Sequence, residues 1–367
     1  MSSFSSSLGI SICPAKSPNI EGTGGFFFLD KAKPGVLHLL TSRHILFHPD
    51  REENKLFSFQ EGSGQPARKV MFLGKAAFES RCKAIESAIV GQQVITDQLN
   101  RRLEAADEME DKEEAEAERA DVEKDMARAA AAIAAFQKLL DDVTKDWKDE
   151  ANRIIGHVTL SPPISFDYGD DGFTDDWAVV EIYPSMIAKL NFVGNIINLS
   201  SVAVDELTAW MYPHLANPSS FKYRGNRLLR LFGIVSDEEM FKANPKTKDH
   251  DNPVIMVTKN GNTSNVTVGR LNSIRAFVRV YTKGQPGKMS KEVCVFPRNS
   301  KSGQFSECGD SGSVVTDDTG RVCGILTGGD GATDISDCTF VTSINFLLKH
   351  LKSFGIEANI FPLAADL

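Results

Sequence analysis

The stretch FSECGDSGSVV, residues 305–315, raises the question of whether its second serine is reactive. Asp310 and Ser311 lie between Gly309 and Gly312, and β-branched residues follow directly. Asp-Ser-Gly is ordinary turn chemistry, so Ser311 could be a nucleophile or only a polar residue before a strand. A nucleophilic serine needs a base that takes its proton and an acid that orients the base. The remaining sequence must therefore supply a histidine and a carboxylate in suitable places.

One histidine and one aspartate have such a context. His44 ends an apolar run, VLHLLTSRH, in which a strand meets a Thr-Ser turn. Asp176 directly precedes the apolar run WAVVEI, and it should have a hydrogen-bond partner because burying a lone carboxylate is costly. Asp175 competes for this role, but its spacing to the run favours Asp176, and we expect Asp175 to be solvated. We assign His48 and His157 to structure or to the surface.

Short β-like runs fill most of the chain and are separated by Gly, Asn, Asp, Ser or Pro. They include GGFFFLD, KVMFLG and RIIGHVTL upstream, and DWAVVEI, NPVIMVTK, SNVTVGRL, IRAFVRVY and RVCGILTGG downstream. Many short strands without helices between them predict barrels or sandwiches. The closing segment SINFLLKHLKSFG, residues 343–355, has helical spacing and a glycine stop, and it predicts a C-terminal helix.

Residues 76–152 have a different composition, rich in Ala, Glu, Lys and Leu, with no proline and with Gly91 as the only glycine. Apolar residues recur there at alternate spacings of four and three, which is a heptad pattern. The stronger series is Val122, Met126, Ala129, Ile133, Phe136, Leu140, Val143 and Trp147, and the weaker is Ile85, Ala88, Gln92, Ile95, Leu99 and Leu103. The pattern predicts an antiparallel helical hairpin with its turn near residues 107–114. A continuous helix that pairs with a second copy of the chain is the alternative.

Composition and charge narrow the class of protein. The chain has a net charge of −8, and residues 79–150 alone contain 20 acidic and 11 basic side chains. The rest of the chain is therefore about neutral, and nothing in it suggests a nucleic-acid partner. No apolar run approaches the ~20 residues of a membrane span, and the first residues do not resemble a secretory signal. We therefore expect an intracellular, cytoplasmic protein without a membrane partner. The six cysteines form no C-x-x-C pair, so we expect free thiols, no metal and no cofactor.

Three blocks carry a resemblance to a known family. LLTSRHIL, DDWAVVEI and CGDSGSVV, in the order His, Asp, Ser, resemble the active-site blocks of the chymotrypsin-like (trypsin-like) serine proteases. GTGGFFF, VCGILTGG and FVTSINFLL resemble further segments of the family, and VTKNGNTSNVTVGRL resembles a segment of its bacterial and fungal members. The resemblance covers most of the chain outside the helical insertion.

The resemblance implies a mainly β fold of two six-stranded antiparallel barrels. Residues 1–75 and 153–190 would form the first barrel, with the helical hairpin 76–152 inserted in it. Residues 191–367 would form the second barrel, which carries the nucleophile and the C-terminal helix.

The resemblance also implies a role for each residue of the site. Ser311 would attack the scissile carbonyl, His44 would accept and return the proton, and Asp176 would orient His44. The backbone N–H groups of Gly309 and Ser311 would form the oxyanion hole.

A primary specificity pocket is implied as well. Its lining would be Phe305, Ser306, Leu326, Thr327, Gly328 and Gly329. Because Phe305 stands where an acid would select Lys or Arg, we expect an apolar residue of medium or large size before the cleaved bond. Glu307, Asp330 and Asp334 are acids that could still reach into this pocket.

Two features depart from the family pattern. Many members are activated by a cleavage that frees an amino terminus to pair with the aspartate before the nucleophile, and no Ile-Val-Gly-Gly occurs here. The partner of Asp310 is therefore open. Cys308 lies one place from the usual cysteine, which argues against the family's disulfide near the pocket.

Three functions are compatible with these residues and motifs. The first is a serine endopeptidase that forms an acyl-enzyme with a protein or peptide substrate, its hairpin serving as a docking arm, a regulatory clamp or a dimer contact. The second is a protease-like scaffold with little or no hydrolysis that binds partners through the hairpin. An esterase with the same three residues is the third.

Overall fold

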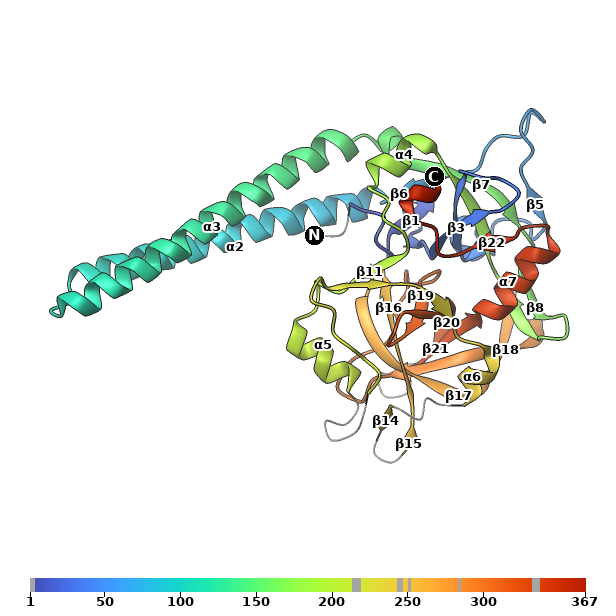
Figure 1. Ribbon diagram of the computed structural model, residues 1–367. Helices are drawn as coiled ribbons and strands as arrows, with labels where there is room; N and C mark the ends of the chain where they lie inside the picture. Colours follow the sequence, from blue (N-terminus) through green and yellow to red (C-terminus); the bar gives the residue numbers. More distant parts are fainter. Residues whose placement is uncertain (1–3, 213–218, 243–246, 250–251, 283–284, 332–336) are drawn as a thin grey trace. The chain divides into compact units, whose positions relative to one another are not determined.

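The computed structural model describes residues 4–212, 219–242, 247–249, 252–282, 285–331 and 337–367. The chain divides into two compact units (Figure 1). The body contains the residues up to Gly74 and those from Ile154 onward, and the hairpin unit is Lys75–Arg153. None of the described helices combines the length and apolarity that a membrane span requires.

The first sheet of the body is built from strands at both ends of the chain. Its order is β2-β1-β6-β7-β10-β4-β3-β22, with β5 paired to β7. The strands are β1 (Ser11–Pro14), β2 (Gly22–Thr23), β3 (Phe26–Asp30), β4 (Leu37–Thr41), β5 (Phe57–Ser58), β6 (Lys69–Phe72), β7 (Ile154–Ser161), β10 (Ala178–Ile182) and β22 (Ala358–Asn359). All residues of β3 and β4 are buried, as expected of strands covered on both faces.

The second sheet contains β13 (Gly233–Ile234), β16 (Ile255–Gly261), β17 (Asn265–Thr282), β18 (Gln285–Pro297), β19 (Val314–Asp317), β20 (Arg321–Asp330) and β21 (Cys338–Ser343). Its order is β13-β20-β19-β16-β17-β18-β21, and β20 also pairs with β21, which closes a ring. Gly324 makes this closure sterically feasible, because a Cβ there would lie 2.1 Å from the Thr342 carbonyl oxygen.

These pairings confirm the mainly β prediction and correct one part of it. The second sheet closes into a ring of six strands, as the barrel prediction requires, with β13 as an addition in parallel to β20. In the described pairings the first sheet does not close, so it is a curled sheet and not a complete hydrogen-bonded barrel.

Shorter elements complete the body. The short hairpins are β8 (Ser165–Tyr168) with β9 (Phe173–Asp175), β11 (Ile196–Asn198) with β12 (Leu228–Arg230), and β14 (Lys248–Asp249) with β15 (Asn252–Pro253). The helices are α1 (Arg43–Leu46), α4 (Pro184–Lys189), α5 (Val204–Met211), α6 (Asp237–Phe241), α7 (Ile344–Ser353) and the 3₁₀ turn η2 (Ala364–Asp366). The predicted C-terminal helix is α7, which Ser343 caps and which ends before Gly355 at a φ of 83°.

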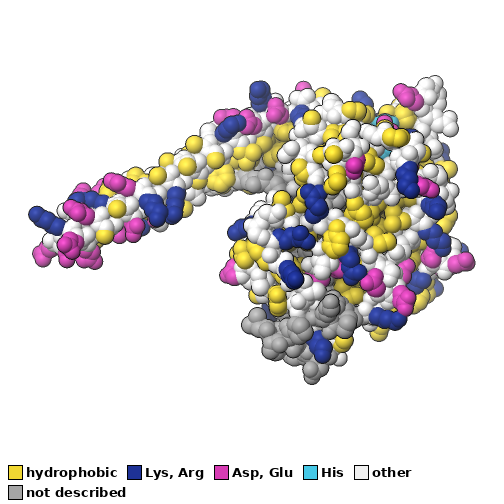
Figure 2. Space-filling view, in the orientation of Figure 1, with side chains coloured by type: hydrophobic (Ala, Val, Ile, Leu, Met, Phe, Trp, Pro, Cys, Tyr) yellow, Lys and Arg dark blue, Asp and Glu magenta, His cyan; other side chains and the backbone are white. Residues whose placement is uncertain are grey.

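The hairpin unit consists of α2 (Lys75–Asp107) and α3 (Lys112–Trp147), followed by the 3₁₀ turn η1 (Glu150–Arg153). The Asp111 side chain accepts hydrogen bonds from the N–H groups of Glu113 and Glu114, so it caps α3. Figure 2 shows hydrophobic side chains along the middle of this unit and charged ones at the end where α2 and α3 are joined.

The heptad pattern is correct for α3 and partly wrong for α2. The eight residues of the stronger heptad series, which form the predicted contact seam of α3, are all buried or half-buried. On α2, Ile95 is 43% exposed, whereas Ile89 is buried and Thr96 is half-buried. The seam of α2 therefore passes through the threonine, whose hydroxyl donates to the Gln92 carbonyl oxygen at 3.0 Å and so has its polar group satisfied.

We predict that the hairpin can be removed without loss of the body. The last strand before it, β6, pairs with the first strand after it, β7, and Met71 lies opposite Ile154. Because the two chain ends are neighbours, a short Gly-Ser turn in place of residues 75–153 should leave both strands in register. Thermal unfolding and circular dichroism of this variant should show a folded β protein. An unfolded product would mean that the body needs the hairpin for stability.

Candidate active site

His44 and Asp176 are brought together by two neighbouring strands. β4 leads into α1, which carries His44, and β10 begins two residues after Asp176. The strands are antiparallel with Ala178 opposite Thr41, so the end of β4 meets the start of β10. Asp176 then contacts His44 twice, accepting its backbone N–H at 3.0 Å and lying 2.5 Å from its ring Nδ1.

This double contact fixes the tautomer and the charge preference of the imidazole. With Nδ1–H donated to Asp176, the Nε2 atom is the one free to accept a proton. Burial lowers the pKa of His44, but the charge of Asp176 and its hydrogen bond outweigh burial, so the pKa is raised above its usual value. The His44 side chain is 29% exposed and that of Asp176 only 6%, so the base can be reached while its acid cannot.

The nucleophile turn requires both of its glycines. Gly309 and Gly312 have φ values of 99° and 89°, which side-chain-bearing residues rarely adopt. A Cβ on Gly312 would lie 2.1 Å from the Thr23 carbonyl oxygen and 2.5 Å from the Thr41 hydroxyl. The turn is therefore pressed against the end of β4, directly before the helix that carries His44.

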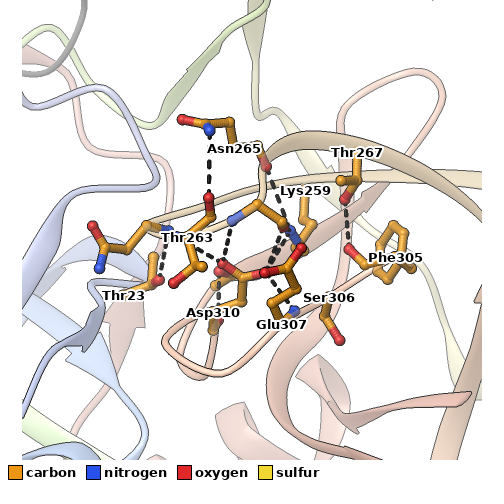
Figure 3. A network of polar contacts seen from close by, with 12 residues as sticks. Thr23, Lys259, Thr263, Asn265, Thr267, Phe305, Ser306, Glu307 and Asp310 are labelled. Atoms are coloured by element: carbon orange, nitrogen blue, oxygen red, sulfur yellow. Dashed lines mark hydrogen bonds and ion pairs between the residues drawn. The ribbon is translucent and has the colours of Figure 1, made fainter. Parts of the chain in front are cut away.

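The buried carboxylate in this turn is that of Asp310. It forms an ion pair with Lys259 of β16. The Lys259 Nζ atom lies 3.0 Å from Asp310 Oδ2, and both side chains are completely buried. Figure 3 shows the surrounding network, in which the carboxylate also accepts the N–H groups of Thr263 (3.0 Å), Ser264 (3.1 Å) and Glu307 (2.9 Å). The hydroxyl of Ser264 is a fifth donor, at 2.5 Å.

These contacts shift the pKa of both buried groups. Burial alone would raise the pKa of Asp310, but Lys259 and the Ser264 and Glu307 hydrogen bonds hold it below its usual value. Burial lowers the pKa of Lys259, and Asp310 only partly opposes this. A carboxylate with five donors, one of which is the Lys259 cation, is a satisfied buried charge, and these contacts hold the turn against the ring.

The groups predicted for the oxyanion hole are available. The Thr263 hydroxyl donates to the Cys308 carbonyl oxygen at 2.8 Å, which fixes the peptide that carries the Gly309 N–H. Among the described residues, the N–H groups of Gly309 and Ser311 have no acceptor. The Ser311 hydroxyl likewise makes no hydrogen bond within the described ranges, so no Ser311–His44 bond is formed in this structure; such bonds are often long in unliganded sites.

A cavity of about 340 Å³ opens beside His44 and Asp176. Of the residues predicted to bind substrate, Thr327, Gly328 and Gly329 line it. Its other walls are mostly apolar and include Phe47, Ile164, Phe166, Val278 and Phe340.

The other predicted pocket residues do not line this cavity. Phe305 is fully buried and lies with its ring 5.6 Å from Lys259 Nζ. The hydroxyls of Ser306 and Thr339 form a hydrogen bond at 2.6 Å. The Leu326 carbonyl oxygen accepts the Gly312 N–H, and the Leu326 N–H donates to the Ser313 carbonyl oxygen.

Two of the acids named as alternatives, Glu307 and Asp330, are exposed and do not line this cavity. Asp334 lies outside the described residues. Cys308 is exposed and its thiol is free. The sulfur atoms of Cys294 and Cys338 lie 2.6 Å apart.

One expectation is wrong: Asp175 is not solvated. It is 1% exposed, and its carboxylate lies 2.7 Å from Nδ1 of the buried His350 on α7. Burial raises the pKa of Asp175, although His350 and Trp177 act in the opposite direction. Asp175 is the last residue of β9, and consecutive side chains of an extended chain point to opposite sides, so it faces α7 while Asp176 faces His44.

Glu292 is a buried acid at the site that sequence reasoning missed. It lines the cavity with His44 and Asp176, and it accepts hydrogen bonds from the Thr174 N–H (3.0 Å) and the Thr342 hydroxyl (3.2 Å). Burial raises its pKa to about 7, with a small contribution from the charge of Asp176. Its only signal in the sequence is a charged residue at an inward position of the run KEVCVF.

Over the ranges that the structure describes, no group of three or more His, Cys, Asp or Glu is arranged to hold a metal ion. The residues of the candidate site offer three kinds of reactive group. They are the imidazole oriented by Asp176, the Ser311 hydroxyl, and the N–H groups of Gly309 and Ser311, which have no acceptor among the described residues.

Comparisons with known proteins agree with the predicted resemblance at long distance. No protein-family model matches the chain, and no curated protein matches it. Solved structures similar to it include a glutamic acid-specific serine protease (10% identity, 95% of this chain and 98% of that chain, TM-score 0.41). They also include Nocardiopsis protease (12%, 94% and 95%, 0.39) and Thermobifida fusca protease A (12%, 97% and 100%, 0.38). These neighbours are proteases by their names, and identities of 10–12% with TM-scores of 0.38–0.41 show a distant likeness only. At these TM-scores, chemistry has to be argued from the contacts of this chain.

We predict that Lys259→Met destabilises the protein by about 3 to 5 kcal/mol, because it leaves the Asp310 carboxylate buried without its cation. Urea unfolding measures the loss. The matched control is Lys349→Met, which removes an exposed ion pair with Asp171 and should change stability little. Equal effects of the two substitutions would show that Lys259 contributes no more than a surface charge.

We predict that Glu292→Gln changes the pH dependence of stability. The native pKa of about 7 exceeds the unfolded value near 4.5, so the folded state binds the extra proton and wild-type stability falls as the pH rises between these values. The glutamine can accept the Thr174 N–H through Oε1 and donate its Nε2–H to the Thr342 hydroxyl oxygen, and it cannot ionise. The free energy of unfolding of Glu292→Gln, relative to that of wild type, should therefore rise by about 3 kcal/mol from pH 4.5 to pH 8, measured by urea unfolding. Parallel curves for the two proteins would contradict the buried acid.

Proposed function

We propose that the chain is a serine endopeptidase in which Ser311 is the nucleophile, His44 the general base and Asp176 the residue that orients the base. The observation that carries the proposal is the two-point contact of Asp176 with His44, beside a nucleophile turn held by the Lys259–Asp310 pair. The presence of all three residues favours an enzyme, since a pure binding scaffold has no use for an oriented base together with a serine in a glycine-bounded turn.

The proposed reaction follows from these positions. Ser311 Oγ attacks the scissile carbonyl carbon while its proton passes to His44 Nε2, and the N–H groups of Gly309 and Ser311 bind the oxyanion. His44 then gives the proton to the leaving amine as the C–N bond breaks, which leaves an acyl-enzyme. Water, deprotonated by His44, releases the acid and restores Ser311.

The resting state is proposed to be competent without a cleavage step. In family members that need cleavage, a new amino terminus neutralises the aspartate before the nucleophile. Here Lys259 already provides that positive charge from within β16. The turn should therefore have its working shape as soon as the chain folds.

The proposed substrate is a polypeptide that lies along Thr327, Gly328 and Gly329 of β20. The two glycines leave room for a substrate backbone, and the neighbouring apolar walls favour apolar side chains. We retain the preference for an apolar residue of medium or large size before the cleaved bond. The hairpin unit is proposed to bind a protein partner or a second copy of the chain.

We predict that a fluorophosphonate probe labels Ser311. Ser311→Ala should abolish labelling, and His44→Ala should reduce it to background. The rate should rise with pH and level off above the raised pKa of His44, because only the neutral imidazole can accept the serine proton.

Asp176→Asn provides the sharper variant of the same experiment. It removes the charge that raises the His44 pKa and favours the wrong tautomer, so labelling should slow by about 10⁴-fold. A folded wild-type protein that resists the probe at every pH would exclude the hydrolase and leave the binding scaffold. Labelling with turnover of esters but not of peptide libraries would indicate an esterase.

A further inference from the structure

A second cavity, of about 720 Å³, lies on the first sheet and shares no lining residue with the cavity beside His44. Three strands contribute its central row. Glu181 of β10 lies opposite His38 of β4 on one side and opposite His157 of β7 on the other. Residues paired directly across strands have side chains on the same face, so the carboxylate stands between two imidazoles.

Both imidazoles are buried and have an unused acceptor. His38 is 3% exposed and His157 is 9% exposed. The Nδ1 atom of each has no hydrogen-bond partner among the described residues. A buried polar atom without a partner costs free energy, so a native structure normally supplies one.

The histidines are neutral near pH 7. Burial lowers the pKa of both, although Glu181 acts in the opposite direction on each. A neutral imidazole has one ring nitrogen that donates and one that accepts a hydrogen bond, so in the tautomer protonated at Nε2 each unpartnered Nδ1 atom can accept an N–H donor.

The remaining polar groups of the cavity make it attractive to a cation. Asp30, Glu61 and Glu181 supply three carboxylates, and Lys33 is the only Lys or Arg in its lining. Lys33 Nζ reaches no closer than 3.9 Å to Glu181 and is 54% exposed, so it satisfies this acid only weakly. Outside the lining, Lys69 is opposite His157 on β6 and is exposed.

The walls are suited to the same kind of ligand. Phe28 stacks on His38 with ring centroids 5.1 Å apart, and Tyr183 stacks on His157 at 5.7 Å. Phe59 and Phe354 complete the aromatic lining. Aromatic faces attract ammonium and guanidinium groups.

We infer that this cavity binds an organic cation, an ammonium or guanidinium group whose N–H donors meet the Glu181 carboxylate and the Nδ1 atoms of His38 and His157. Such a group satisfies all three acceptors at once. An anion would meet three carboxylates. A metal ion would need a ligand arrangement that the described residues do not form. The cation can come from a free small amine or from an arginine or lysine side chain of a polypeptide.

The test uses the full chain as Ser311→Ala, so that peptides are not consumed. Isothermal titration calorimetry compares acetyl-Gly-Arg-Gly-amide with the same peptide carrying citrulline, a neutral isostere of arginine. We expect the arginine peptide to bind at least tenfold more tightly. Butylguanidinium is the free-cation arm: affinity equal to that of the peptide indicates a small amine, and weaker affinity indicates a polypeptide side chain.

Two variants locate the ligand. Glu181→Gln, which keeps the shape of the row, should weaken binding at least tenfold, whereas Lys33→Gln should strengthen it by removing a competing cation. Glu357→Gln is the matched control, because it removes an exposed carboxylate that pairs with Lys31 outside the cavity. Glu181→Gln in the unmodified chain should leave fluorophosphonate labelling unchanged, since this cavity and the candidate active site have no residue in common.

Equal affinity for the arginine and citrulline peptides would overturn the inference without any variant. Binding of the cation that persists in Glu181→Gln would do the same. Movement of the His38 and His157 ring nitrogen resonances on titration with butylguanidinium, and not of the His44 resonances, would place the ligand between the two imidazoles.

Discussion

The buried negative charge of Asp310 is the constraint on which the rest of the site depends. A carboxylate removed from water is tolerated only when cations and donors replace its hydration. Its partners come from three places: Lys259 within β16, Thr263 and Ser264 in the turn that follows β16, and Glu307 in the nucleophile turn itself. One ion thereby ties a surface turn to the interior of the closed ring, and the orientation of the neighbouring serine follows from it.

The two consecutive acids Asp175 and Asp176 tie the other half of the site together. They face opposite sides of one extended segment, the first toward His350 on α7 and the second toward His44 on α1. Trp177 packs edge-on against His350, so the segment is also held by an aromatic contact. The last helix of the chain therefore helps to fix the position of an acid near its middle.

The sequence was sufficient for features that depend on residue type and local spacing. The mainly β fold and the helix α7 could be predicted in this way, whereas the pairing of His44 with Asp176 was implied by the resemblance to a known family. The partner of Asp310 could not, because Lys259 is some fifty residues distant and looks like any charged residue in an alternating strand. Glu292 was missed for the same reason, because the sequence alone does not distinguish a glutamate that points into the interior from one that points to solvent.

The point at which the hairpin leaves the body has a consequence for how such a chain can change over evolutionary time. Met71 and Ile154 are paired neighbours, so whatever joins them is, for the body, a loop whose ends are already together. The entropic cost of closing a loop rises only with the logarithm of its length. Lineages could therefore lengthen, shorten or exchange the intervening residues with little penalty to the framework, which makes this position a natural place for new domains to be acquired.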